Sequence, residues 1–261
     1  MSNLLKARKN GYEAANRHSI SDLGFFQAED GIRDQILDFL KPLAIFYSVI
    51  ILLMATVTIV FGAVSSTENV SFSNMEFNSI VFLCFCGVMT FQDDFKLFIQ
   101  NGMTRKMIFQ SFVCEFLCVA ALMALVESVV GVFLQKIFEY HPLFFLLYEN
   151  EGFLLQFIWL FLAYTATVFL AYLAATIRNR IGKAPFILGL ITLGLILFIL
   201  FPAINTATHG EFFSRLLPVI KFLMGYVGDS FQPLNPALLF IGVILACMAG
   251  SYLLTRRAEI K

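Results

Sequence analysis

The sequence predicts an all-α integral membrane protein with six transmembrane helices, and two properties indicate this class. The first is composition: 59% of the 261 residues are hydrophobic, 14% are charged, and the mean hydropathy is +0.81. About a quarter of the residues in a soluble domain are charged, so this chain is too apolar to be one. The second property is that the apolar residues form long runs, near the ~20 residues that cross a bilayer core of about 30 Å.

Residues 1–34 form a polar segment that differs from the rest of the chain. Within residues 25–34, FFQAEDGIRD, the stretch QAEDGIRD matches a commonly used DNA-sequencing adapter when it is back-translated. We interpret residues 1–34 as an artefactual or disordered tail, with a genuine polar cytoplasmic tail as the alternative, and exclude them from functional reasoning. Residues 35–261 are predicted to form a single six-span transmembrane domain.

The first span is predicted from Leu43 to about Val64, directly after Pro42. Proline suits the first turn of a helix because its missing N–H has no intrahelical partner there. After a short polar loop, the pattern Ser73-x-x-Glu76 matches a capping box, in which the serine and glutamate side chains satisfy backbone N–H groups. This pattern predicts the start of the second span, at about Asn74–Gln92.

The segment that follows, FQDDFKLFIQNGMTRKMIF at residues 91–109, mixes charged residues with phenylalanines at helical spacing. Such a pattern predicts a short amphipathic helix at the membrane surface. Asn101-Gly102 predicts the end of this helix, because glycine readily adopts the left-handed conformation that closes helices. Thr104 is predicted to cap a new helix that begins at Arg105.

The third span is predicted from about Lys106 to Phe133 and is interrupted by Glu115 and Glu127. The fourth, Gly152–Ile177, contains several alanines, and such small residues let helices approach closely in lipid. A tight basic turn is expected at residues 178–183.

The fifth span is predicted to run from Pro185 to about Pro202. Apolar residues broken by Arg215 and Lys221 then indicate an outer interfacial helix between the last two spans. The sixth span, Pro236 to about Leu254, follows Asn235 as a cap.

Lysine and arginine concentrate in cytoplasmic segments, which gives the orientation. With the N-terminus inside, the predicted cytoplasmic segments hold Lys41, Lys96, Arg105, Lys106, Arg178, Arg180, Lys183, Arg256, Arg257 and Lys261, and the outer ones hold Lys136, Arg215 and Lys221. The protein is therefore predicted to lie in the cell membrane with both termini in the cytoplasm.

The chain carries no enzyme signature: it lacks a G-x-x-x-x-G-K-[ST] phosphate loop, a His-Glu-x-x-His motif and a G-x-S-x-G motif. No metal, cofactor or nucleic-acid partner is expected for this chain. Glu115 and Glu127 are the acids deepest in a predicted span, where a charge costs about 2.5–3.5 kcal/mol. They could line a transport path, pair helices through hydrogen bonds or extend outward, and an intramembrane enzyme would need a further catalytic partner.

Six spans, the element QNGMTRKMIF at residues 100–109 and the amphipathic outer segment together resemble the type-2 ABC exporter permeases, most closely the small permeases of Gram-positive bacteria. The resemblance covers about residues 36–261. It implies a permease subunit that dimerises with a second permease and pairs with a separate ATP-binding subunit, which would hold ATP and Mg²⁺.

In that family the loop after the second span forms a coupling helix that docks on the ATPase. The resemblance implies that residues 93–101 form this helix, with Gly102 as its stop, Arg105 and Lys106 as a basic shoulder, and the outer helix at Glu211–Gly225. The implied contact residues are Asp93, Asp94, Phe95, Lys96, Phe98, Gln100, Asn101, Gly102, Arg105 and Lys106. The alternative is a membrane scaffold or sensor subunit without transport of its own.

Overall fold

The structure is a computed structural model. It describes residues 41–52, 56, 72–73, 75–100, 102–137, 140–149, 152–227 and 230–256, and at 72–73, 89–97, 99, 137, 227 and 230 it describes the backbone alone. The predicted tail at residues 1–34 and the second half of the predicted first span lie outside the described residues.

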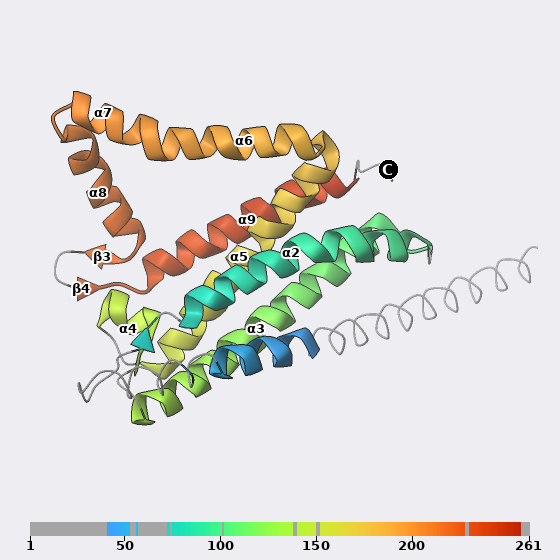
Figure 1. Ribbon diagram of the computed structural model, residues 1–261, viewed down its shortest axis with the longest axis horizontal. Helices are drawn as coiled ribbons and strands as arrows, with labels where there is room; N and C mark the ends of the chain where they lie inside the picture. The colour runs from blue at the N-terminus through green and yellow to red at the C-terminus, as the bar shows by residue number, and fades with distance from the viewer. Residues whose placement is uncertain are drawn as a thin grey trace, which may run out of the picture.

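The described elements are almost all helical (Figure 1). In chain order they are the helix Lys41–Leu52, β1 (Phe72–Ser73), α2 (Met75–Gln100), α3 (Arg105–Ile137), β2 (Tyr140–His141), α4 (Leu143–Tyr148), α5 (Phe153–Ile181), α6 (Lys183–Leu195), the π-helical segment η1 (Ile196–Leu200), α7 (Phe201–Ala207), α8 (Glu211–Leu223), β3 (Tyr226–Val227), β4 (Ser230–Phe231) and α9 (Leu234–Arg256).

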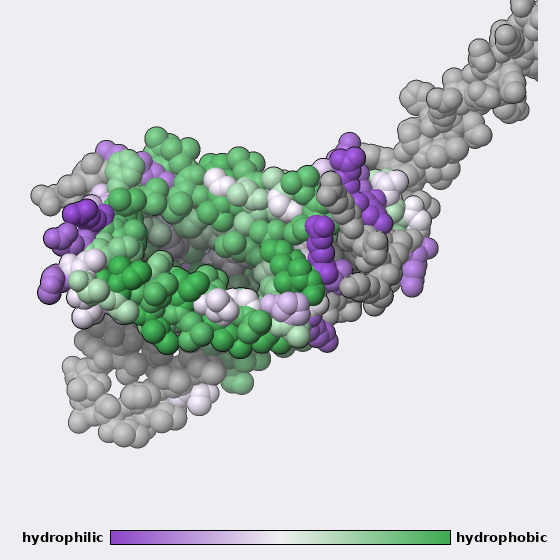
Figure 2. All heavy atoms as spheres, turned by 90° about the horizontal axis from the view of Figure 1, so that it is seen from above, coloured by the Kyte–Doolittle hydropathy of each residue, from purple (hydrophilic) through white to green (hydrophobic). Residues whose placement is uncertain are grey.

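Four helical stretches are long and apolar enough to cross a membrane by length and composition. They are Arg105–Lys136, Phe153–Ile181, Lys183–Ala207 and Leu234–Arg256, and two shorter apolar helices are Lys41–Leu52 and Met75–Val88. Figure 2 shows a broad hydrophobic face between two hydrophilic ends, as expected of a protein surrounded by lipid. The all-α, membrane-type class is confirmed, whereas the count of six spans stays a prediction.

α5 is the central helix, since it packs against α2, α3 and α9. α2 approaches α5 tightly at Gly87, where an added Cβ would lie 2.8 Å from both Ala171 Cβ and Val168 O. Any larger residue there would force the two helices apart. The predicted role of the small residues in this span therefore agrees with the packing, and α2 contributes a small residue of its own.

The helices alternate in direction, so their connections gather at two ends of the bundle (Figure 1). One end, which we call the inner end, holds the α2–α3 turn, the α5–α6 turn and the last turn of α9. The other, the outer end, holds both strand pairs, α4 and α8. There β1 pairs in parallel with β2, which brings Phe72 opposite Tyr140.

α6, η1 and α7 form one helical stretch that diverges from the bundle (Figure 1). None of their residues is buried. The π-helical turn lies just before Pro202, which has no backbone N–H to donate, and such a turn commonly accommodates a local change in the hydrogen-bond ladder. α8 then leads back to the outer end of α9, where Asn235 Nδ2 donates to Phe222 O at 3.0 Å.

Two predicted boundaries were wrong. The amphipathic segment after the second span is not a separate helix, because α2 continues to Gln100 without a helix breaker before Asn101. The basic turn expected at residues 178–183 is narrower, because α5 continues to Ile181 and only Gly182, at φ +93°, interrupts the helix. The Ser73 side chain of the predicted capping box lies outside the described residues, so that cap stays a prediction, while Glu76 makes a contact with α4 that is described below.

Candidate functional site

The α2–α3 turn at the inner end is held by backbone geometry on both sides. Gly102 adopts φ +77°, and the N–H of Met103 donates to Phe98 O at 3.0 Å, which closes the end of α2. Thr104 Oγ1 accepts the N–H of Met107 at 3.3 Å, which caps α3. The predicted helix stop at Gly102 and the predicted cap at Thr104 are both confirmed.

The predicted ATPase-contact residues differ in their surroundings. Gln100, Gly102, Arg105 and Lys106 are exposed at the turn. Phe98 is buried and packs on Phe112, with ring centroids 5.8 Å apart. Phe98 therefore contributes to the core, and a partner's access to this end depends on the exposed residues.

The side chains of Asp93, Asp94, Phe95 and Lys96 and the whole of Asn101 lie outside the described part of the chain, although residues 93–96 have a helical backbone.

Arg105 makes a contact that the sequence did not predict. Its guanidinium donates to the carbonyl oxygen of Arg256 at 2.7 Å, although the two residues are 151 positions apart. The last carbonyls of a helix lack intrahelical donors, and a cation there interacts favourably with the helix dipole. Arg105 thereby joins the start of α3 to the end of α9.

Glu127 is the centre of a buried hydrogen-bond cluster near the outer end. Its carboxylate accepts hydrogen bonds from Tyr47 at 3.2 Å, from Ser79 and from Tyr164. The donors come from the helix Lys41–Leu52, from α2 and from α5, so one α3 side chain joins four helices. These interhelical hydrogen bonds favour the helix-pairing role for Glu127, while a place on a transport path stays a prediction.

Glu76 lies in the same region and is 2% exposed. Its Oε1 accepts the N–H of Leu143 at 3.2 Å, which ties the first turn of α2 to α4. The Tyr140 hydroxyl also faces this carboxylate, and burial raises the pKa of that tyrosine, so the hydroxyl stays protonated. The sequence pattern attributed a local capping role to Glu76, and only the folded chain places it beside Glu127.

Glu115 belongs to a different part of the core. It is buried in the inner half of α3, close enough to Cys86 and Tyr172 to interact with them electrostatically. The aromatic core around it includes Phe112, Phe116 and Tyr172. The two predicted intramembrane acids therefore lie in separate clusters.

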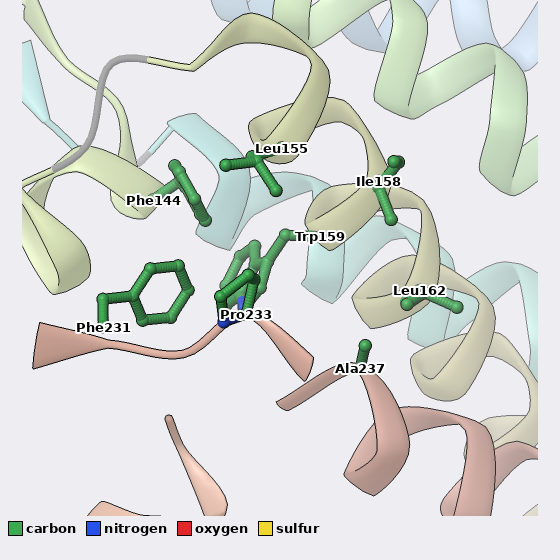
Figure 3. A pocket seen from close by; sticks show the side chains of 8 residues that line it. All are labelled: Phe144, Leu155, Ile158, Trp159, Leu162, Phe231, Pro233 and Ala237. Carbon is green, nitrogen blue, oxygen red and sulfur yellow. The ribbon is translucent and has the colours of Figure 1, made fainter. Parts of the chain in front are cut away.

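A small cavity of about 30 Å³ lies at the outer end, where α4, α5 and the start of α9 meet (Figure 3). Its lining residues are Phe144, Leu155, Ile158, Trp159, Leu162, Phe231, Pro233 and Ala237. The stacked rings of Tyr148 and Phe231 lie beside it, with centroids 3.9 Å apart. The lining is almost entirely apolar, with the Trp159 indole N–H as a polar group, and a space of this size has room for about one or two waters, so it is a packing gap and no substrate site.

No group of three or more His, Cys, Asp or Glu side chains that could hold a metal ion occurs among the described residues. Comparisons with family models, with curated proteins and with solved structures found no match to this chain. The fold and these features define an all-α membrane protein with a capped, exposed turn at one end and a buried carboxylate cluster near the other.

Proposed function

We propose that this chain is the permease subunit of an ATP-driven exporter and that the inner turn receives the ATP-binding subunit. The observation that carries the proposal is the construction of this turn. Gln100, Gly102, Arg105 and Lys106 are exposed on a short connection whose two sides are fixed by the Gly102 stop and the Thr104 cap. A movement of the bound ATP-binding subunit against this turn would therefore shift α2 and α3 themselves, because the short turn between them has little freedom to bend.

The lengths of these helices support the mechanism. α2 has 26 residues and α3 has 33, and at 1.5 Å per residue they extend about 39 Å and 50 Å. Both pack on α5, and both carry members of the Glu127 cluster toward their outer ends. Closure of an ATPase dimer against the inner turn would therefore shift the buried cluster that joins the helices at the outer end.

The chain itself lacks a phosphate-binding loop, so the hydrolysis of ATP would occur in the partner. Pairing with a second permease, to form the transport path between two copies, belongs to the same proposal. A membrane scaffold or sensor subunit would use the same turn to hold a partner without moving a substrate.

The test first asks whether an ATP-binding protein is encoded beside this gene, and then measures co-purification of the full-length chain with that protein. The double variant Asp94→Lys with Arg105→Glu reverses charge at the inner end and should reduce recovery of the ATPase at least tenfold, with membrane insertion unchanged. Because Arg105 also bonds the end of α9, Lys106→Glu serves as a second inner variant that keeps that bond.

The matched control is Glu211→Lys with Arg215→Glu on α8. This pair forms an exposed salt bridge of 3.0 Å at the outer end, and the swap makes the same types of change while preserving opposite charges. The control should leave recovery unchanged. Equal recovery from wild type and both inner variants would contradict the docking role, and recovery of an ATPase that no substrate stimulates would favour a scaffold.

A further inference from the structure

The outer end contains two carboxylates withdrawn from water on neighbouring helices. Glu76 of α2 is 2% exposed and Glu127 of α3 is 4% exposed. They lie close enough to interact electrostatically, and both act on the same tyrosines, Tyr47 and Tyr164. Burying even one ionised carboxylate is costly unless a compensating charge accompanies it.

The described surroundings of this pair supply hydroxyls but no full positive charge. The groups that face the carboxylates are Tyr47 from the helix Lys41–Leu52, Ser79 from α2, Tyr140 from β2, the Leu143 N–H from α4 and Tyr164 from α5. Arg215, a cation at the outer end, pairs with the exposed Glu211 and with neither buried acid. The start of α2 adds roughly half a positive charge near Glu76, which leaves more than one negative charge uncompensated.

One carboxylate oxygen of the pair also lacks a hydrogen-bond donor. Glu76 Oε2 has no hydrogen-bond partner of normal geometry among the described residues, although the side chain is almost completely buried. A buried acceptor without a donor costs about 1–3 kcal/mol. By contrast, Glu127 receives three hydroxyl donors, so the open position lies on the Glu76 side of the cluster.

We propose that Glu76 and Glu127 form a binding site for one monovalent cation, either a proton or Na⁺, near the outer end of the bundle. A proton would reside on Glu76 Oε2 as the hydroxyl of a neutral carboxylic acid. Sodium would take the same position between the two carboxylates, since carboxylate and hydroxyl oxygens are ligands that suit hard cations.

Occupancy of this site affects how strongly α2 and α3 are held together near the outer end. With the cation bound, the cluster retains about one negative charge, which the three hydroxyls of Tyr47, Ser79 and Tyr164 solvate. Without it, two carboxylates repel each other across α2 and α3. The site does not depend on the proposed transport function, because it rests on the charges and contacts of the cluster.

The test uses the full-length chain in nanodiscs of neutral lipid. Thermal unfolding is followed through the fluorescence of Trp159, the one tryptophan of the chain, which lies on α5 one turn before Ala163 and Tyr164. One arm lowers the pH from 8 to 6 in choline chloride, and the other replaces choline by Na⁺ at pH 8 and constant ionic strength. Saturation of the site should raise the unfolding midpoint by about 5 °C or more in at least one arm.

Glu76→Gln should remove that rise, because it removes the carboxylate that would take up the proton and one of the two negative charges that Na⁺ would compensate. Glu115→Gln is the matched control, since it changes another buried glutamate of the bundle and should keep the rise. A response to acid alone identifies the proton, and a response to Na⁺ that K⁺ does not reproduce identifies sodium. The proposal is overturned if neither arm stabilises the wild type, if Glu76→Gln still responds, or if Glu115→Gln loses the response as well.

Infrared spectroscopy of the wild-type protein keeps the test decisive if Glu76→Gln fails to fold. A proton-occupied site gives the carbonyl stretch of a protonated carboxylic acid at pH 7, and a sodium site gives a carboxylate band that shifts when Na⁺ replaces choline. The absence of both signals would overturn the proposal without reference to any ATPase partner.

Discussion

The two ends of the bundle stabilise their polar groups in different ways. At the inner end, the α2–α3 turn exposes Gln100, Arg105 and Lys106, and local backbone geometry at Gly102 and Thr104 fixes it. Near the outer end, Glu76 and Glu127 are buried and accept hydrogen bonds from distant parts of the chain, Glu76 from the Leu143 backbone N–H and Glu127 from side chains such as Tyr47. The inner end therefore offers a surface to a partner, whereas the outer cluster determines how the helices are held together.

The largest effect is expected from the outer cluster. Glu127→Ala removes the acceptor of three interhelical hydrogen bonds, each worth about 0.6 kcal/mol on average in a membrane protein. The expected loss is about 2 kcal/mol of unfolding free energy or more, measured by denaturation in mixed micelles. Glu211→Ala, which affects an exposed salt bridge, is the control and should change the stability by well under 1 kcal/mol. Equal losses in the two variants would remove the distinction between the ends.

A smaller effect is expected at the inner stop. Gly102→Ala should cost about 1 kcal/mol, because φ +77° is unfavourable for a residue with a Cβ. Space is not the reason, since nothing lies within 4 Å of the added Cβ. Gly189→Ala meets the same open space within α6 without a positive φ, so thermal unfolding should show it to be neutral or slightly stabilised. A neutral Gly102→Ala would show that the stop is not rigid.

The Thr104 cap is expected to contribute less. Thr104→Ala should cost about 0.5 kcal/mol, at the low end for an N-cap, because the site is exposed and the bond to the Met107 N–H is 3.3 Å long. Faster amide hydrogen exchange in the first turn of α3 is the measurement. Thr104→Ser keeps the hydroxyl and should restore the wild-type rate. If serine and alanine exchange equally fast, the hydroxyl is not the cap.

The smallest effect is local. Arg105→Gln should leave the global stability nearly unchanged but speed amide exchange in the last turn of α9, which loses its donor to the Arg256 carbonyl. Lys106→Gln is the neighbouring control and should leave α9 unaffected. Unchanged exchange near Arg256 in the Arg105 variant would show that this contact does not hold the end of the helix.

The sequence predicted the inner end better than the outer cluster, for a physical reason. Helix stops and caps depend on neighbouring residues, so Asn101-Gly102 and Thr104 could be read from the sequence alone. The outer cluster depends on which faces of several helices meet. In helices that are apolar all round, hydrophobic periodicity does not identify the buried face, so Tyr47, Ser79 and Tyr164 gave no signal.

Glu76 is a second residue whose tertiary contact the local sequence did not predict. The local pattern Ser73-x-x-Glu76 predicted a capping role for Glu76 within its own helix, whereas the fold brings the start of α4 against this side chain. The carboxylate then accepts the Leu143 N–H, 67 residues away. The expected separate helix at residues 93–101 failed because a surface helix and the last turns of α2 have the same apolar spacing.

The most direct test of the inner end as a docking surface is site-specific photo-cross-linking in membranes. A photoreactive residue at Gln100, exposed beside the α2–α3 turn, is compared with one at Phe213 on the exposed outer helix α8. The proposed function predicts a cross-link from position 100 to a nucleotide-binding chain and none from position 213. No such cross-link at position 100, or equal cross-linking at both positions, would contradict it.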